Sequence, residues 1–152
     1  MRNISTTDIN HILYENAVTR RYFVGTFPAC MAPKTRRKFY TFITNSEEHD
    51  KAGEHWNAWR VKNQDIIFFD SFSRAPTHPT FPSYYSDIIS NFDNVYFVSK
   101  RVQSITSELC GIFCIHWIYI MSLGLDCESF LSDYTPDYVK NDVIVKNIVK
   151  SF

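Results

Sequence analysis

The sequence predicts an α+β domain in which helices flank a central, mostly antiparallel sheet. Aromatic residues make up 16% of the 152 residues and only 4 are glycine. This composition is typical of strands and a tightly packed core rather than of a glycine-rich phosphate-binding sheet. Helical patterns stand at both ends of the chain, around a series of strand-like segments. The length suits one domain and no linker or repeat divides it, so we expect residues 1–152 to form a single domain.

The first predicted element is a helix over residues 8–17. Ser5-Thr6-Thr7-Asp8 offers hydroxyl and carboxylate caps for its first turn. The apolar residues Ile9, Ile12 and Leu13 follow at helical spacing. Such a segment is expected to pack one apolar side on the core.

Four strands are predicted next. Residues 39–44, 56–61, 65–70 and 95–99 are rich in aromatic and β-branched side chains. The polar Lys62-Asn63-Gln64 has the length of a hairpin turn between the second and third of them. These two strands are therefore expected to run antiparallel.

The second half of the chain is predicted to be mainly helical. A proline-rich loop over residues 74–82 leads into a short helix over residues 83–92, and a strongly apolar helix follows from Cys110 to Gly124. Thr135-Pro136-Asp137 is typical of a helix start, with proline at the first helical position. The last helix then places four side chains on one face: Tyr138, Val145, Val149 and Phe152.

Charge argues against a dedicated nucleic-acid binder. Lys+Arg and Asp+Glu each number 16, so the formal net charge is zero, whereas phosphate recognition normally needs a cationic excess. Arg20-Arg21 and the segment Lys34–Lys38 are local basic clusters that can supply only modest, salt-sensitive affinity. Nucleic acid is thus a possible partner that is not strongly indicated.

Cysteine usage indicates a reducing compartment. Cys30, Cys110, Cys114 and Cys127 occur in a chain without a signal-peptide pattern, so we expect free thiols in a protein that is not secreted. The longest apolar run, residues 111–125, is too short for a membrane span. No CxxC pair occurs and no metal site is expected.

His55 and Asp70 form the first candidate for chemistry. His55 lies in Gly53-Glu54-His55-Trp56 at the start of one hairpin strand, and Asp70 lies at the end of its partner, so the hairpin brings the two side chains together. A carboxylate there would hold the imidazole in one tautomer and stabilise its cation. By itself, this pair is also compatible with an ordinary surface hydrogen bond.

Cys110 is the second candidate. It stands between a polar loop and an apolar helix, where the helix dipole favours a thiolate. Gly111 permits a close approach of backbone or substrate, and Gln103 can fold back to place its amide beside the Cys110 backbone N–H, which would form an oxyanion hole. The alternative for Cys110 is a small core residue, and that interpretation is the one we give to Cys114.

These motifs resemble those of the adenovirus-type cysteine endopeptidases, the adenain family of adenoviruses, virophages and Maverick/Polinton elements. This family shares a clan with the ubiquitin-like-protein-specific proteases. The resemblance covers about residues 5–125 and includes Phe68-Phe69-Asp70-Ser71-Phe72 and Cys110-Gly111-Ile112-Phe113-Cys114, in the order His, Asp, Gln, Cys. It implies a papain-like fold in permuted order. The family often has glycine where Ser73 stands, which implies a differently shaped loop after Asp70.

The resemblance also implies a role for each site residue. Cys110 is the nucleophile, His55 the general base and later acid, Asp70 the orienting carboxylate, and Gln103 an oxyanion-hole donor. No metal or other cofactor is needed for this chemistry. Glu54 and Trp56 are candidates for substrate binding, with a core position as the alternative for Trp56.

The resemblance implies a maturation protease that cleaves capsid or core precursor proteins at small, glycine-containing sites. We expect it to act as a monomer inside the virion or the infected cell, with an activating peptide or DNA as possible cofactors. One alternative is a deconjugating protease for ubiquitin-like proteins, which would use the same residues. Another is an inactive binding module that keeps the fold.

Overall fold

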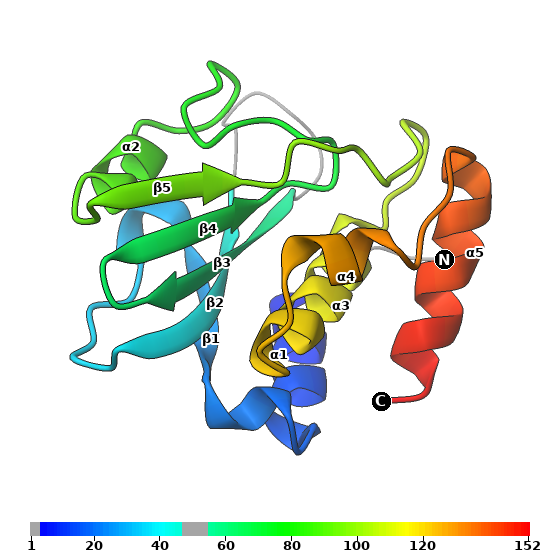
Figure 1. Ribbon diagram of the computed structural model, residues 1–152, viewed down its shortest axis with the longest axis horizontal. Helices are drawn as coiled ribbons and strands as arrows, with labels where there is room; N and C mark the ends of the chain where they lie inside the picture. Colours follow the sequence, from blue (N-terminus) through cyan, green and yellow to red (C-terminus); the bar gives the residue numbers. More distant parts are fainter. Residues whose placement is uncertain (1–3, 47–54) are drawn as a thin grey trace.

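The computed structural model describes residues 4–46 and 55–152. One five-stranded sheet has the strand order β1-β2-β3-β4-β5, and helices pack around it (Figure 1). The strands are β1 (Phe23–Pro28), β2 (Phe39–Asn45), β3 (Trp56–Lys62), β4 (Asp65–Phe69) and β5 (Asn94–Phe97). The α-helices are α1 (Thr6–Glu15), α2 (Tyr84–Ile89), α3 (Cys110–Ser122), α4 (Cys127–Leu131) and α5 (Tyr138–Lys150).

The sheet is mixed. β2, β3 and β4 pair antiparallel at its centre, as predicted, but β1 and β5 join the two edges in parallel. The expectation of a mostly antiparallel sheet is therefore wrong for both edges. The reason is the connections: residues 29–38 and the segment that carries α2 return the chain to the opposite end of the sheet before the next strand begins.

Most predicted elements are present, with shifted ends. α1 begins at Thr6 because Ser5 caps it through a reciprocal capping box with Asp8. α5 begins at Tyr138 because the Asp137 side chain is the N-cap. Pro136 therefore precedes the cap, and its predicted place at the first helical position is wrong.

The sheet separates two apolar layers. α1, α3, α4 and α5 supply residues to the layer on one face, and α2 packs on the other. Adjacent residues of β4 point into opposite layers, Phe69 toward α3 and Phe68 toward α2. Helices thus cover both sides of the sheet, which confirms the predicted α+β architecture.

α3 forms the centre of the larger layer. Every one of its residues except Tyr119 is buried. No helix in the described part of the chain is long and apolar enough to cross a membrane.

Candidate active site

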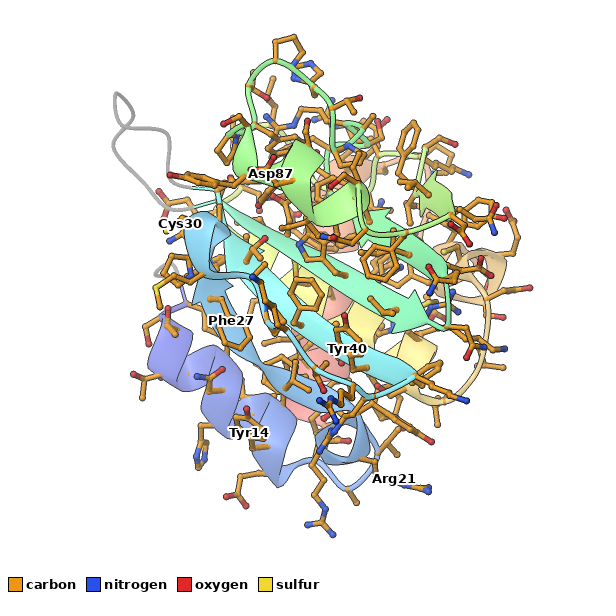
Figure 2. The ribbon with its side chains drawn as sticks, turned by 90° about the vertical axis from the view of Figure 1, so that its left-hand side faces the viewer. Tyr14, Arg21, Phe27, Cys30, Tyr40 and Asp87 are labelled. Carbon is orange, nitrogen blue, oxygen red and sulfur yellow. The ribbon has the colours of Figure 1, made fainter. Side chains whose placement is uncertain are left out.

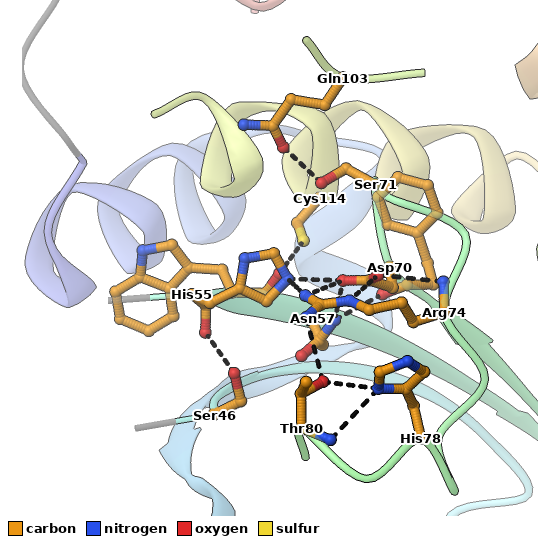
Figure 3. Close-up of polar contacts among 12 residues, drawn as sticks. Ser46, His55, Asn57, Asp70, Ser71, Arg74, His78, Thr80, Gln103 and Cys114 are labelled. Atoms are coloured by element: carbon orange, nitrogen blue, oxygen red, sulfur yellow. Dashed lines mark hydrogen bonds and ion pairs between the residues drawn. The ribbon is translucent and has the colours of Figure 1, made fainter. Parts of the chain in front are cut away.

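The candidate residues meet where three elements begin or end. His55 directly precedes β3 and Asp70 directly follows β4, and these strands are antiparallel neighbours. His55 Nε2 lies 2.5 Å from Asp70 Oδ1 (Figure 3). Cys110 is the first residue of α3. The hairpin therefore brings His55 and Asp70 together as the sequence predicts.

Asp70 is fully buried and held by several donors. Its oxygens accept hydrogen bonds from Asn57 Nδ2 at 2.9 Å, from Arg74 Nε at 2.9 Å and from the Arg74 backbone N–H at 3.1 Å. Burial by itself would raise the pKa of this carboxyl, but the hydrogen bonds and charges of His55 and Arg74 outweigh it and hold the pKa well below its usual range. Asp70 is therefore a fixed carboxylate.

His55 is placed to keep a proton. Its side chain is 21% exposed, and the ring lies near Phe72 and Phe81, with centroid separations of 5.7 and 6.3 Å. Burial opposes the imidazolium, but hydrogen bonds to Asp70 and Cys110, together with their charges, raise the pKa of His55 to about 9. Since Nε2 faces Asp70, Nδ1 is the ring nitrogen left for the Cys110 thiol. His55 thus connects the carboxylate and the thiol.

Arg74 is a site residue that the sequence analysis missed. It pairs with Asp70, and one guanidinium nitrogen lies 3.0 Å from His55 Nε2. The guanidinium carbon lies 4.6 Å from the centre of the Phe81 ring. Its spacing of four residues from Asp70 is a signal that could have pointed to the ion pair.

Ser73 shapes the loop between Asp70 and Arg74. Its φ is +66°, in the left-handed region that favours glycine. Its backbone N–H donates to the Asp70 carbonyl at 2.8 Å. The serine therefore adopts a backbone conformation that a glycine would adopt at lower cost. The expectation that this loop differs in shape from that of the family stays a prediction.

A chain of buried hydrogen bonds leads from Trp59 through Thr44, Tyr85 and Asn57 to Asp70. The Trp59 indole N–H donates to Thr44 Oγ1 at 2.9 Å, and Thr44 and Tyr85 share a hydrogen bond of 2.8 Å. The Tyr85 hydroxyl donates to Asn57 Oδ1 at 2.8 Å, and Asn57 Nδ2 donates to Asp70. An indole only donates and a carboxylate only accepts, so the direction of every bond in the chain is fixed.

Gln103 is buried and oriented. Its Oε1 accepts a hydrogen bond from Ser71 Oγ (Figure 3). Its Nε2 donates to the Ser107 carbonyl at 2.8 Å. Nε2 also lies 3.4 Å from Ser107 Oγ, so its second N–H would have to leave this longer contact to reach a substrate. Its role in an oxyanion hole with the Cys110 backbone N–H stays a prediction.

Gly111 allows α3 to pack tightly next to the nucleophile. A Cβ atom at this position would lie 2.3 Å from Ile4 Cγ2 and 3.0 Å from Trp56 Cδ1. Trp56 is only 1% exposed. The close approach that the glycine permits is therefore made by Trp56 and Ile4, and the burial of Trp56 favours its interpretation as a core residue. Glu54 lies outside the described residues.

Cys110 and Cys114 are both buried, with Cys110 4% exposed, but it is Cys110 that hydrogen-bonds to His55. All four cysteines are free, and Cys114 is fully buried with its Sγ 3.4 Å from the Trp56 carbonyl oxygen. Burial raises the pKa of the Cys114 thiol well above its usual value, which keeps it protonated and agrees with a packing role. Among residues 4–46 and 55–152, no cluster of metal-ligating side chains occurs.

Comparison with known proteins supports the fold. The chain aligns with the crystal structure of the pS273R protease of ASFV with a TM-score of 0.63 and 14% identity, over 94% of this chain and 66% of the other. The fold is shared with a known protease. ChlaDub1 from Chlamydia trachomatis aligns with a TM-score of 0.54 and 13% identity, over 76% of this chain and 60% of the other.

These matches are structural. No protein-family model matches the chain, and no curated protein matches it in sequence. The chain spans just under two thirds of the length of the two structural neighbours, at 66% and 60%. At these identities the likeness concerns the fold, and the adenain family itself is not confirmed.

Proposed function

We propose that residues 1–152 form a cysteine endopeptidase domain with Cys110 as nucleophile, His55 as general base and acid, and Asp70 as the orienting carboxylate. The observation that carries the proposal is the position of His55. It lies between a buried, ionised Asp70 and the Cys110 thiol, and both partners raise its pKa. That is the arrangement an imidazolium–thiolate pair requires.

The chemistry follows from these positions. The Cys110 thiolate attacks a peptide carbonyl carbon, and the Cys110 backbone N–H and the second N–H of Gln103 donate to the oxygen that becomes negative. The His55 imidazolium gives its proton to the leaving amine as the C–N bond breaks and a thioester forms. His55 then removes a proton from water as hydroxide adds to the thioester. The C–S bond breaks, the acid product leaves, and the Cys110 thiolate is restored beside the His55 imidazolium. No step requires a metal or other cofactor.

For the biological role, we propose a viral maturation protease that cleaves capsid or core precursors at glycine-containing sites. The motif resemblance to the adenain family and the structural likeness to the ASFV protease support this role. It would act as a monomer within the virion or the infected cell, where an activating peptide or DNA could regulate it.

One observation favours the alternative, a deconjugating protease for ubiquitin-like proteins. Such an enzyme needs an exposed face on which a folded substrate can dock. Three consecutive apolar residues of the edge strand β5 are exposed, Val95 to 39%, Tyr96 to 54% and Phe97 to 43%. This edge could serve as such a face.

The test of the catalytic assignment compares two cysteines. In a Cys30→Ser background, which removes the exposed thiol, Cys110→Ala should abolish cleavage of glycine-containing peptides and labelling by a thiol-directed probe. Cys114→Ala should retain both, because burial raises the pKa of the Cys114 thiol and keeps it protonated. Circular dichroism checks that both variants fold. Unchanged labelling of the Cys110 variant would overturn the assignment.

The test of the substrate incubates the protein with the capsid precursor encoded by the same genetic element, beside a panel of ubiquitin-like fusion proteins. We expect cleavage of the precursor. Cleavage of the fusions alone would favour the deconjugating enzyme instead.

A further inference from the structure

A cavity lies away from the catalytic residues. It has a volume of about 920 Å³ and lies on the face of the sheet that α2 covers, between α2, β2 and the loop of residues 32–38 (Figure 2). None of His55, Asp70, Gln103 and Cys110 lines it. Its volume is within the range of sites that enclose small molecules.

One rim of this cavity is strongly cationic. Lys34, Arg36, Arg37 and Lys38 line it, and all are exposed. Within the described part of the chain, no carboxylate forms an ion pair with any of the four. The whole chain has zero formal net charge, so this is a local concentration of like charge. Its self-repulsion is relieved when an anion binds.

The floor of the cavity is apolar and partly aromatic. Tyr40 and Phe42 from β2 and Val61 from β3 are buried beneath it, and Phe92 follows α2 at its side. Tyr84 on the α2 rim is 49% exposed. Tyr40 and Phe42 stack on neighbouring protein rings, so the exposed Tyr84 ring is the one that offers a face on which a flat ring system can stack.

We propose that this cavity binds a nucleotide, with the phosphates on the Lys34–Lys38 loop and the base against the exposed Tyr84 ring at the edge of the apolar floor. The arginine pair offers planar donor forks that suit phosphate oxygens. Asn63 and Gln64 at the end of the cavity supply amide groups for the edge of a base.

The opposite rim orients the ligand. Asp87, an exposed residue of α2, also lines the cavity. Its carboxylate repels phosphate and accepts hydrogen bonds from hydroxyl groups. The sugar therefore faces α2 while the phosphates face the loop.

The strand order disfavours an extended peptide as the occupant. The strands that border the cavity, β2 and β3, are interior strands whose backbone groups are already paired on both sides. A peptide thus finds no free sheet edge here to which it could add a strand. The cations occupy one short loop, which suits a single polyphosphate better than a long duplex.

The test measures binding of a fluorescent ATP analogue by anisotropy, with unlabelled ATP as competitor. Arg36→Ala/Arg37→Ala should weaken binding at least about tenfold, because it removes two of the four cations proposed to bind the phosphates. The matched control is Arg20→Ala/Arg21→Ala, a second exposed arginine pair that does not line the cavity. Equal loss in both double variants, or no loss in either, would overturn the proposal.

Two further measurements identify the ligand and its place. Adenosine and inorganic triphosphate should each compete much more weakly than ATP, since each has only one of the two recognised parts; triphosphate competing as well as ATP would overturn the nucleotide assignment. So would competition by an acidic peptide but not by ATP.

The position of the bound nucleotide is tested through Cys30, which is exposed and lines the cavity. In a Cys110→Ala background, ATP should slow the reaction of Cys30 with a bulky maleimide. Unchanged reactivity at saturating ATP would place the nucleotide elsewhere. Because this background lacks the proposed nucleophile, the outcome does not depend on the proteolytic activity.

Discussion

His55 keeps its proton because Asp70 and Cys110 both favour the imidazolium over the neutral ring. Its pKa is raised to about 9, so the protonated form persists through neutral pH and is lost as the pH rises through that value. The leaving amine needs this proton, and kcat/KM should therefore fall above about pH 9. A pH–rate profile with a fluorogenic peptide measures this upper limb.

Asp70→Asn should shift the alkaline decline of kcat/KM to lower pH and reduce kcat, since it removes the negative charge that stabilises the imidazolium. Asp93→Asn, at an exposed aspartate, is the control and should leave the profile unchanged. An upper limb that stays in place in the Asp70 variant would contradict the assigned role of Asp70.

Asn57 is predicted to position Asp70. Asn57→Leu removes the amide that donates to the carboxylate and keeps a similar volume. Because Asn57 hydrogen-bonds to the carboxylate and is fully buried, we expect kcat to fall by about tenfold with KM unchanged. Steady-state kinetics separate the two parameters.

The matched comparison is Tyr85→Phe, one step further along the same hydrogen-bond chain. It should cost about 1–3 kcal/mol of stability, because it leaves the Asn57 Oδ1 acceptor and the Thr44 hydroxyl donor without their partner, with a smaller loss of kcat. A larger loss of kcat in Tyr85→Phe than in Asn57→Leu would contradict the assignment of Asn57 as the residue that positions Asp70.

The pairing of His55 and Asp70 could be predicted from the sequence because both are tied to one local hairpin. Cys110 could be predicted because the change from polar loop to apolar helix is visible in the residue pattern. Tyr85 could not, since it reaches Asn57 from a helix 28 residues further along the chain. Such a contact depends on how α2 packs on the sheet, which periodicity does not report.

Among the elements, the junction of α3 with β3 sets the position of the nucleophile. Gly111→Ala should destabilise the fold and lower activity, because the new methyl group meets Ile4 and the rigid Trp56 ring. We expect a cost of about 1–3 kcal/mol, less the benefit of alanine in a helix. Urea unfolding and peptide cleavage measure the two effects.

Ile4→Ala combined with Gly111→Ala is the control for this mechanism. It removes the atom that would lie nearest to the new methyl group, at 2.3 Å, and should restore part of the loss. A double variant less stable than the sum of the two single changes would show that Ile4 is not the obstacle.

The elements that the sequence did not predict are short or lie at an edge. α4 has only 5 residues, Cys127–Leu131, too few for a helical period to be seen. β1 contains Gly25 and ends at Pro28, both of which weaken a strand pattern. Its pairing with β2 depends on the returning loop of residues 29–38, a property of the tertiary fold rather than of the segment.

At the scale of the whole molecule, the sheet separates two apolar layers and contributes residues to both. Val145 of α5 lies in the layer on the α3 face, and Ile88 of α2 lies in the layer on the opposite face. The two side chains have no packing partner in common in these layers, because the strands stand between them. Substitutions at such sites are expected to be energetically independent.

Val145→Ala and Ile88→Ala should each cost about 2 kcal/mol, since each removes buried methyl groups and leaves a cavity. The double variant should lose the sum of the two costs to within about 0.5 kcal/mol. Urea titrations of the four proteins in the Cys110→Ala background, which prevents self-cleavage, measure these free energies.

Because both layers depend on the same five strands, every variant should unfold in one transition, with tryptophan fluorescence and far-UV circular dichroism coincident. A coupling much larger than the expected error, or two separate transitions, would mean that the layers do not behave as two faces of one cooperative unit.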